Sequence, residues 1–321
     1  MRRSWICVAA FAACLVSNAA LAQSWPTKRV QVIVPFTAGS ATDIMARTVT
    51  QRLSEQLGQP FVVENRPGAG GTIGVAAVAK ADPDGHAILV HSSSYTITPT
   101  TYPNTPYDAV RDLVGITPLA LLPQVLVVSP NKNIRTVQDL VRAAKAKPGA
   151  MNYASAGVGT ATQLSAERFR LAAGIDAVHV PFRGTPEALT EIIAGRVDYY
   201  FCPVDAVLPM ITEKRLLALA MGSSKRSAAL PDVATTLEAG IPNYDYNFWV
   251  GMFVPSKTPR EIVNRLHQEI AKALESKDVR ESMAKLGAEP MPMRPDEFDS
   301  YIRNEITTNA ALVKAAGIPI Q

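Results

Sequence analysis

Two short segments of the chain combine small residues with the expected start of a helix, an arrangement that can bind an anion. Residues 34–43 read VPFTAGSATD, and residues 155–163 read SAGVGTATQ. A helix amino terminus presents N–H groups without intrahelical partners and the positive end of the helix dipole, so it attracts negative charge. Small side chains let a ligand approach this backbone closely. The residues of interest are Ala38, Gly39, Ser40 and Ala41 in the first segment and Ser155, Gly157, Gly159, Thr160 and Thr162 in the second.

The absence of lysine and arginine from both segments narrows the choice of anion. A phosphate-binding loop of the P-loop type needs a lysine after its glycines. GVGTAT at 157–162 supplies the first two glycines of the dinucleotide fingerprint G-x-G-x-x-G, but Thr162 replaces the third. GAGGTIG at 68–74 has Ile73 at that position. We therefore expect no nucleotide and no other cofactor, which leaves an organic acid as the favoured ligand.

Catalytic and metal-binding constellations are not evident in the sequence. The four histidines lack the spacing of a metal site, and no G-x-S-x-G nucleophile elbow accompanies them. His179 precedes VPFRG at a strand end and is a candidate for a cleft. His91 is followed by Ser92, Ser93 and Ser94, which can bond a ligand or cap a helix, and the cap is favoured. We expect Cys202 to be a buried apolar side chain and not a nucleophile.

The first 22 residues have the three parts of a cleavable secretory signal. Arg2 and Arg3 precede an apolar stretch that ends in ALA at 20–22, and this stretch is too short to span a membrane. Cleavage after Ala22 predicts an exported, periplasmic chain with no membrane-inserted segment. A lipid anchor on Cys14 is the weaker alternative, because the preceding FAA is a poor lipidation sequence.

The charge balance of the exported chain argues against strongly electrostatic partners. The full sequence has 32 basic and 28 acidic side chains, and loss of the two signal arginines lowers the formal charge from +4 to about +2. So small a net charge does not indicate binding to nucleic acid or to an anionic membrane. About 300 residues at 47% hydrophobic content can bury a large core and usually form two domains.

Short β-rich runs alternate with helix-like stretches, a pattern typical of α/β layers with largely parallel sheets. The expected strands cover 30–34, 61–64, 87–91, 125–129, 151–154, 177–180, 199–202, 217–221 and 249–254. The expected helices cover 43–57, 136–147, 161–173, 186–194, 259–275 and a stretch from Arg294.

Two segments of the sequence share one pattern, which suggests how these elements are grouped. VIVPFTAGSATDIMARTV and MNYASAGVGTATQLSAERF each run from a strand through a small-residue turn into a helix, about 118 residues apart. Open α/β sheets bind ligands at the carboxyl ends of their strands. Two similar lobes that face each other across a cleft would therefore bring both turns to one ligand, as in a solute receptor.

Six further segments lie along nearly the whole exported chain in a fixed order. They are WPTKRVQVIVPFTAGSATDIMAR, VVENRPGAGGTIGVAAVAKADPDGHAIL, YDAVRDLVGITPLA, VPFRGTPEALTEIIAGRVD, RSAALPDVATTLEAGIPNYDYNFWVGMFVPSKTP and EFDSYI. In this order they closely resemble the extracytoplasmic substrate-binding receptors of tripartite tricarboxylate transporters, the Bug family.

The resemblance implies a two-lobed α/β fold of the periplasmic-binding-protein kind, with two mostly parallel sheets, flanking helices and a ligand cleft between the lobes. Lobe one is expected to combine 24–124 with 248–321, and lobe two to span 125–247. The chain would cross between the lobes near LALLPQV at 119–125 and NFWVGMF at 247–253.

Receptors of this family grip a carboxylate between two strand-turn-helix units, which correspond here to 36–43 and 155–162. Phe36 would form a wall of the cleft, while Asp43 would order the turn, hold a bridging water or cap the helix. Arg183 would lie near a second carboxylate or form a structural ion pair, and Asp205 is a weaker candidate because its charge repels a diacid. The expected ligand-binding residues are Phe36, Thr37, Ala38, Gly39, Ser40, Asp43, Ser92, Ser155, Gly157, Gly159, Thr160, Thr162, Arg183, Gly184, Thr185 and Asp205.

Two positions depart from the family pattern. Ser40 stands where the first turn usually has the second glycine of a pair, which adds a hydroxyl and reduces backbone freedom. Gln163 stands where a histidine is frequent, which removes a pH-dependent donor. The ligand therefore remains open among dicarboxylates, tricarboxylates, aromatic acids, amino acids and nicotinate-like compounds.

The implied action is capture without covalent chemistry. A monomeric receptor closes its lobes on a small carboxylate and then docks on membrane permease subunits. Two other functions remain open at this point. A periplasmic sensor would pass the closed state to a signalling partner, and an enzyme acting on small carboxylic acids would need a perturbed acid or base in the cleft.

Overall fold

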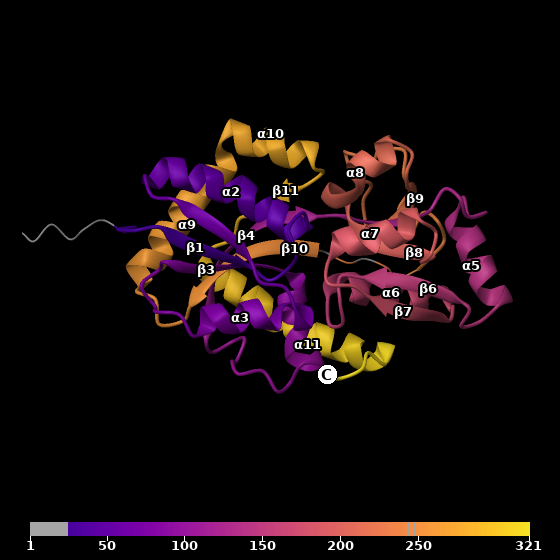
Figure 1. The fold of residues 1–321 in the computed structure, drawn as a ribbon, viewed down its shortest axis with the longest axis horizontal. Coiled ribbons are helices and arrows are strands. Elements are labelled where there is room, and N and C mark those ends of the chain that lie inside the picture. The colour runs from indigo at the N-terminus through magenta and orange to yellow at the C-terminus, as the bar shows by residue number, and fades with distance from the viewer. Residues whose placement is uncertain (1–24, 243, 245, 247) are drawn as a thin grey trace, which may run out of the picture.

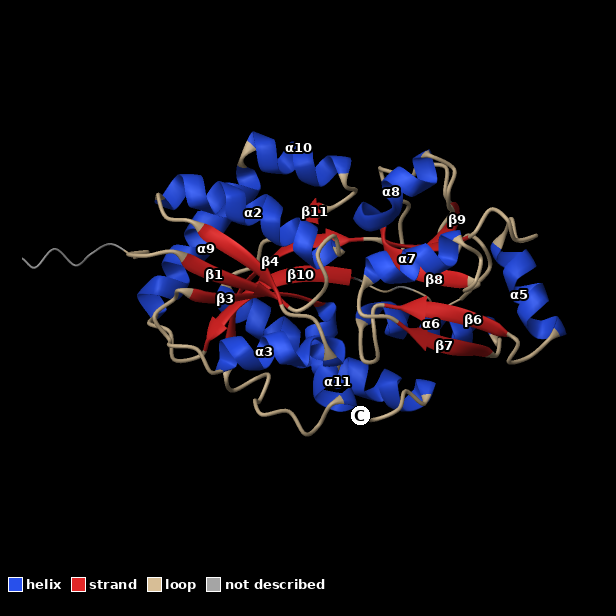
Figure 2. Cartoon of the chain, in the orientation of Figure 1, coloured by secondary structure: helices blue, strands red, loops and turns tan. Residues whose placement is uncertain are grey.

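The protein is built from two β-sheets with helices on both faces of each (Figures 1 and 2). The structure, a computed structural model, describes residues 25–321 except 243, 245 and 247. The expected signal at 1–22 lies outside the described residues. Within the described part of the chain, no helix has the length and apolar character needed to cross a bilayer.

The first sheet has six strands in the order β11-β4-β10-β3-β1-β2. One of its faces is covered by α2, α9 and α10, and the other by α3 and the start of α11 (Figure 1). The strands are β1 (Val30–Val34), β2 (Phe61–Asn65), β3 (Ala87–Ser92), β4 (Leu113–Leu122), β10 (Phe248–Pro255) and β11 (Glu289–Pro290). The helices are α2 (Ala41–Leu57), α3 (Thr72–Ala79), α4 (Thr98–Thr101), α9 (Arg260–Glu275), α10 (Lys277–Lys285) and α11 (Pro295–Ala316), with short 3-10 turns η1 (Ala69–Gly71) and η2 (Ser93–Thr96).

The second sheet has five strands in the order β7-β6-β8-β5-β9. Its two apolar faces are covered by α5 with α6 and by α7 with α8. The strands are β5 (Gln124–Val128), β6 (Met151–Ser155), β7 (Ala177–Pro181), β8 (Tyr199–Pro203) and β9 (Leu217–Met221). The helices are α5 (Val137–Ala146), α6 (Ala161–Ala173), α7 (Thr185–Ile193) and α8 (Val204–Thr212).

Both sheets are mixed, whereas the sequence pattern predicted mostly parallel ones. Strand β1 runs parallel to β2 and β3, but β10 is antiparallel to β3 and β4. Likewise β6 runs parallel to β7 and β8, but β5 is antiparallel to β8 and β9. The antiparallel strands are those next to the passages between the sheets, where no helical crossover forces a parallel return.

The chain passes from one sheet to the other at a single residue, since β4 ends at Leu122 and β5 begins at Gln124 with Pro123 between them. A second passage lies between β9 and β10, where three residues are outside the described set. Helix α11 belongs to the first sheet but reaches the second, because Arg170 of α6 donates a hydrogen bond from Nη2 to the carbonyl of Ala316, 3.1 Å away.

Candidate functional site

A small cavity lies between the two sheets, at the carboxyl ends of β1, β3, β6 and β8. Its volume is about 20 Å³, enough for about one water molecule. Most of its polar side chains carry hydroxyls, and none of the described residues that line it is charged. The first sheet and its helices contribute Phe36, Ser40, Ala41, Thr42, Ser92, Ser94 and Phe248, and the second contributes Ala156, Thr160, Thr162, Thr185 and Pro203.

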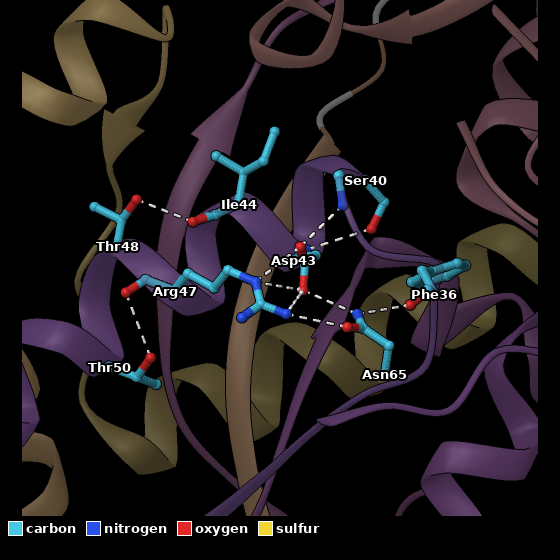
Figure 3. Close-up of polar contacts among 9 residues, drawn as sticks. Phe36, Ser40, Asp43, Ile44, Arg47, Thr48, Thr50 and Asn65 are labelled. Atoms are coloured by element: carbon cyan, nitrogen blue, oxygen red, sulfur yellow. Dashed lines mark hydrogen bonds and ion pairs between the residues drawn. The ribbon is translucent and has the colours of Figure 1, made fainter. Parts of the chain in front are cut away.

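The first turn is held by the buried carboxylate of Asp43 (Figure 3). Its oxygens accept hydrogen bonds from the Gly39 N–H at 2.9 Å, from Arg47 Nε at 3.0 and 3.1 Å, and from Asn65 Nδ2 at 2.9 Å. Asn65 also donates to the carbonyl of Phe36 at 3.0 Å. Burial alone would raise the pKa of Asp43, but the hydrogen bonds from Arg47, Gly39 and Asn65 outweigh it, and its pKa lies below the ordinary value. Asp43 therefore orders the turn and does not line the cavity.

The second turn is held by side chains in a similar way. Thr160 caps α6 with its hydroxyl and donates to the carbonyl of Gly157 at 2.7 Å. The N–H of Gly159 donates to Gln163 Oε1 at 2.8 Å. The N–H groups of Gly157 and of Ala156 are also taken, by the hydroxyls of Ser155 and Thr162 respectively. Most turn N–H groups thus serve the turn itself.

A few N–H groups at the two helix starts keep no acceptor. In the described part of the chain, no acceptor is present for the backbone N–H groups of Ala41 and Thr42 in α2 or of Thr162 in α6. All three residues line the cavity. The N–H of Ala161, by contrast, donates across the cleft to Ser94 Oγ at 2.9 Å. The cavity therefore collects hydrogen-bond donors from two helix termini on opposite sides.

The two sides of the cleft are in direct contact around this cavity. Besides the bond from Ala161 to Ser94, the hydroxyl of Tyr102 donates to the carbonyl of Val158 at 3.4 Å. A Cβ at Gly184 would overlap Thr37 Oγ1, and a Cβ at Gly70 would lie 2.7 Å from the carbonyl oxygen of Val158. The absence of side chains at these glycines permits this close contact.

The structure brings six of the residues predicted for ligand binding into the cavity wall, namely Phe36, Ser40, Ser92, Thr160, Thr162 and Thr185. Gly39, Asp43, Ser155, Gly157 and Gly159 form hydrogen bonds that hold the two turns, Thr37 and Gly184 meet across the cleft, and Ala38 is exposed in the first turn. The list of expected ligand-binding residues left out Ala41, Thr42, Ser94, Ala156, Pro203 and Phe248, although Ala41 had been singled out among the small residues of the first turn and Ser94 as a residue that bonds a ligand or caps a helix. Ala41 and Thr42 lie inside the first quoted segment, and their position in the first turn of α2 was the available signal.

Two charged candidates lie away from the cavity wall. Arg183 is exposed, and its backbone N–H donates to Glu187 Oε2 at 3.2 Å. Asp205 is buried in the first turn of α8, where both carboxyl oxygens lack a hydrogen-bond partner among the described residues. Burial raises the pKa of Asp205 to about 7. Cys202 is buried, and burial raises the pKa of its thiol well above the ordinary value.

His91 and His179 both contact other polar groups of the protein. His91 is fully buried, its Nδ1 lies 3.0 Å from the carbonyl of Ser92, and burial lowers its pKa to about 4. His179 lies behind the second turn, with Nε2 2.6 Å from Ser155 Oγ. Among the described residues, no group of three or more His, Cys, Asp or Glu side chains is arranged to hold a metal ion.

The role of Asp43 in the first turn predicts a pH-dependent loss of stability. A carboxylate whose pKa is lowered by folding stabilises the native state above its ordinary pKa of 3.8, and this contribution is lost as the pH falls through the lower native pKa. Asp43→Asn should reduce the free energy of unfolding by on the order of 1 kcal/mol at pH 7, since solvent screens the exposed Arg47. Urea unfolding at pH 7 and pH 3 should show this difference shrinking at pH 3.

The matched control is Asp232→Asn at an exposed position. It should change the free energy of unfolding by less than about 0.5 kcal/mol. A deficit for Asp43→Asn that is equal at both pH values would contradict the assigned role of the Asp43 charge.

Comparison with known protein families gives a match over residues 45–318 to the model described as "Tripartite tricarboxylate transporter family receptor". Among characterised sequences, the protein BugT of Bordetella pertussis is 35% identical over 302 residues, which is 94% of this chain and 93% of BugT.

Solved structures agree with this match. A structure described as a periplasmic transporter superposes with a TM-score of 0.89 at 34% identity and covers 93% of this chain and 100% of its own. Rpa4515 of R. palustris with adipate gives 0.89 at 31% identity, over 92% and 99% of the two chains. MatC (Rpa3494) of Rhodopseudomonas palustris with bound malate gives 0.84 at 30% identity, over 90% and 100%.

These matches confirm the two-sheet periplasmic-binding-protein fold and the family resemblance drawn from the sequence motifs. The family consists of solute-binding receptors and not of enzymes. The chain belongs to the tripartite tricarboxylate transporter receptor family.

Proposed function

We propose that this protein is a periplasmic receptor that captures a small organic carboxylate between two lobes and delivers it to membrane permease subunits. The observation that carries the proposal is the convergence of N–H groups from α2 and α6 on one uncharged cavity. An ionised carboxylate only accepts hydrogen bonds, so it matches a site composed of N–H and hydroxyl donors. Relatives with bound adipate and malate support this class of ligand.

The donors of the cavity are sufficient for useful affinity. A hydrogen bond to a charged group contributes about 1.5 to 3 kcal/mol. Four such bonds give about 6 to 12 kcal/mol before ordering costs, and micromolar binding needs about 8 kcal/mol. The three N–H groups supply this number of donors together with the hydroxyl of Ser40, whose oxygen accepts from the Asp43 N–H and whose own proton has no acceptor among the described residues.

Capture requires the lobes to separate and close. A cavity with room for about one water molecule does not admit an acid of the size of malate, so we propose that an open form binds the ligand first. Lobe one would comprise 24–124 with 248–321, and lobe two 125–247. Rotation would occur at Pro123, between β4 and β5.

The signal-like segment and the periplasmic relative support an exported location. Family membership supports docking of the closed, monomeric receptor on permease subunits.

Removal of one N–H group from the cavity tests the carboxylate proposal. Ala41 occupies the first position of α2, where proline is tolerated, and Ser40 before it already has φ −72° and ψ 157°, which suit a residue preceding proline. Ala41→Pro should therefore retain the fold but weaken binding of malate or adipate about tenfold or more, because one hydrogen bond to the carboxylate is lost. Calorimetric titration measures the change.

Two controls separate this loss from other effects. Lys277→Pro makes the same change at the first position of α10, after Ser276 with φ −65° and ψ 144°, and should leave binding unchanged. Ala41→Val adds bulk at the cavity but keeps the N–H, so it should bind more tightly than Ala41→Pro. Equal affinities for wild type and Ala41→Pro would refute the role of this N–H group.

A pair of glycines tests whether ligand capture needs the closed contact. Gly70 (φ 64°, ψ 10°) and Gly58 (φ 66°, ψ 12°) have almost the same backbone conformation. A Cβ at Gly70 would press on Val158 of the other lobe, whereas one at Gly58 meets nothing within 4 Å. Gly58→Ala should lose only the stability that its positive φ costs and should bind acid like wild type. Gly70→Ala, whose Cβ would also lie 3.0 Å from Tyr102, should lose more stability and bind acid more weakly in a titration. Equal affinity of the two variants would argue against closure at this contact.

A further inference from the structure

The hydrogen bonds behind the second turn form one directed chain. The Gly159 N–H donates to Gln163 Oε1 at 2.8 Å, which fixes the orientation of the Gln163 amide. Its Nε2 therefore faces His179 Nδ1, 3.1 Å away. An amide nitrogen can only donate, so His179 Nδ1 accepts this bond. A neutral imidazole with an accepting Nδ1 carries its proton on Nε2.

This series of hydrogen bonds ends on the same turn at which it began. His179 Nε2 donates to Ser155 Oγ at 2.6 Å. The Ser155 hydroxyl in turn donates to the carbonyl of Gly157 at 3.0 Å and accepts from the Gly157 N–H at 3.0 Å. Both ring nitrogens of His179 and both polar atoms of the Gln163 amide thus take part in one consistent arrangement.

The surroundings of His179 favour its neutral form. Its ring stacks on Tyr153 of β6, with ring centroids 5.0 Å apart, and burial lowers its pKa to about 4. The Tyr153 hydroxyl hydrogen-bonds to Glu167 of α6, and Glu167 is paired with Arg170 at 2.6 Å. The charge of Glu167 is therefore already matched by Arg170.

The backbone of the second turn needs hydrogen bonds from side chains to keep one shape. Gly157 has φ 128° and Gly159 has φ 72°, and glycine has little intrinsic preference for one such conformation. The hydroxyls of Thr160 and Thr162, which line the cavity, are bonded to the backbone of the same turn. A change in the Gly157–Gly159 backbone therefore moves the groups that face the ligand.

We propose that Gln163 and His179 are positioning residues, which hold the second turn in its ligand-binding shape through a fixed amide orientation and a fixed imidazole tautomer. This inference rests on the proposed function of the cavity. It also assigns the close Ser155–His179 pair a structural role. In this tautomer Nε2 is a donor and cannot accept the serine proton, as a nucleophile–base pair would require.

A double-mutant cycle on acid binding tests the positioning role. Gln163→Met keeps the length of the side chain but removes its hydrogen bonds, and His179→Phe keeps a ring against Tyr153. Each single variant should bind malate or adipate about tenfold more weakly than wild type. The double variant should also lose only about tenfold, because both changes break the same chain.

The control for the cycle is Gln138→Met in the first turn of α5, where the amide is exposed and donates to the carbonyl of Ala239. It should bind like wild type. Wild-type affinity in either single variant, or a loss of about a hundredfold in the double variant, would overturn the proposal, because independent structural effects add.

The tautomer of His179 is measurable without a ligand, by nitrogen NMR of the imidazole ring. We expect protonation on Nε2 in the wild type. In Gln163→Glu a carboxylate replaces the amide donor beside Nδ1, so Nδ1 should become protonated and the pKa of His179 should rise. A wild-type ring protonated on Nδ1 would overturn the proposal. If the wild type binds neither acid, the function proposed for the cavity fails for these ligands, while the NMR result still decides the hydrogen-bond chain.

Discussion

The arrangement of the cleft depends on one constraint: a backbone N–H at a helix start has no intrahelical acceptor and must find another partner. At α2 and α6 some of these groups, and most N–H groups of the turns before them, are satisfied by the protein itself. Asp43, Gln163 and the hydroxyls that cap the two helices take the turn N–H groups. The few that remain, at Ala41, Thr42 and Thr162, face one cavity from two sides. On the proposed function, selectivity for an acceptor-only ligand would follow from donors that the protein leaves without partners.

The same constraint explains why two lobes are needed. On the proposed function, each lobe alone would offer too few donors to hold a carboxylate tightly, and only a closed arrangement would place both sets within reach of one ligand. Closure in turn requires close backbone approach, which Gly70 and Gly184 permit. Side chains behind each turn fix its shape, with a carboxylate at Asp43 on one side and the Gln163–His179 pair on the other. The two turns are alike in position but are supported by different chemistry.

Much of this arrangement was predictable from the sequence, because strand-turn-helix units have strong local signals. Both turns and nearly all the strands were placed within a residue or two. Strand β4 was missed because Pro118 lies inside it, where proline usually argues against a strand. Helix α8 was also missed, because it follows Pro203 and contains Pro209, and proline usually argues against a helix interior. The side chains that support the turns from behind could not be predicted, because Asn65 and His179 come from other strands. For the same reason the sequence could not show that Arg183 is exposed and Asp205 buried.

The most direct measurement is a calorimetric titration of the exported chain with malate and adipate, each beside its uncharged diamide. The uncharged N–H and hydroxyl donors of the cavity should bind the ionised acids but not the diamides. An amide oxygen is a weaker acceptor than a carboxylate oxygen, and the amide N–H groups would meet no acceptor. Binding of an acid at micromolar to submillimolar concentration with a silent diamide is the predicted result. Binding of the diamides or of a cationic solute, with no response to either acid, would contradict a carboxylate clamp formed by the two helix termini.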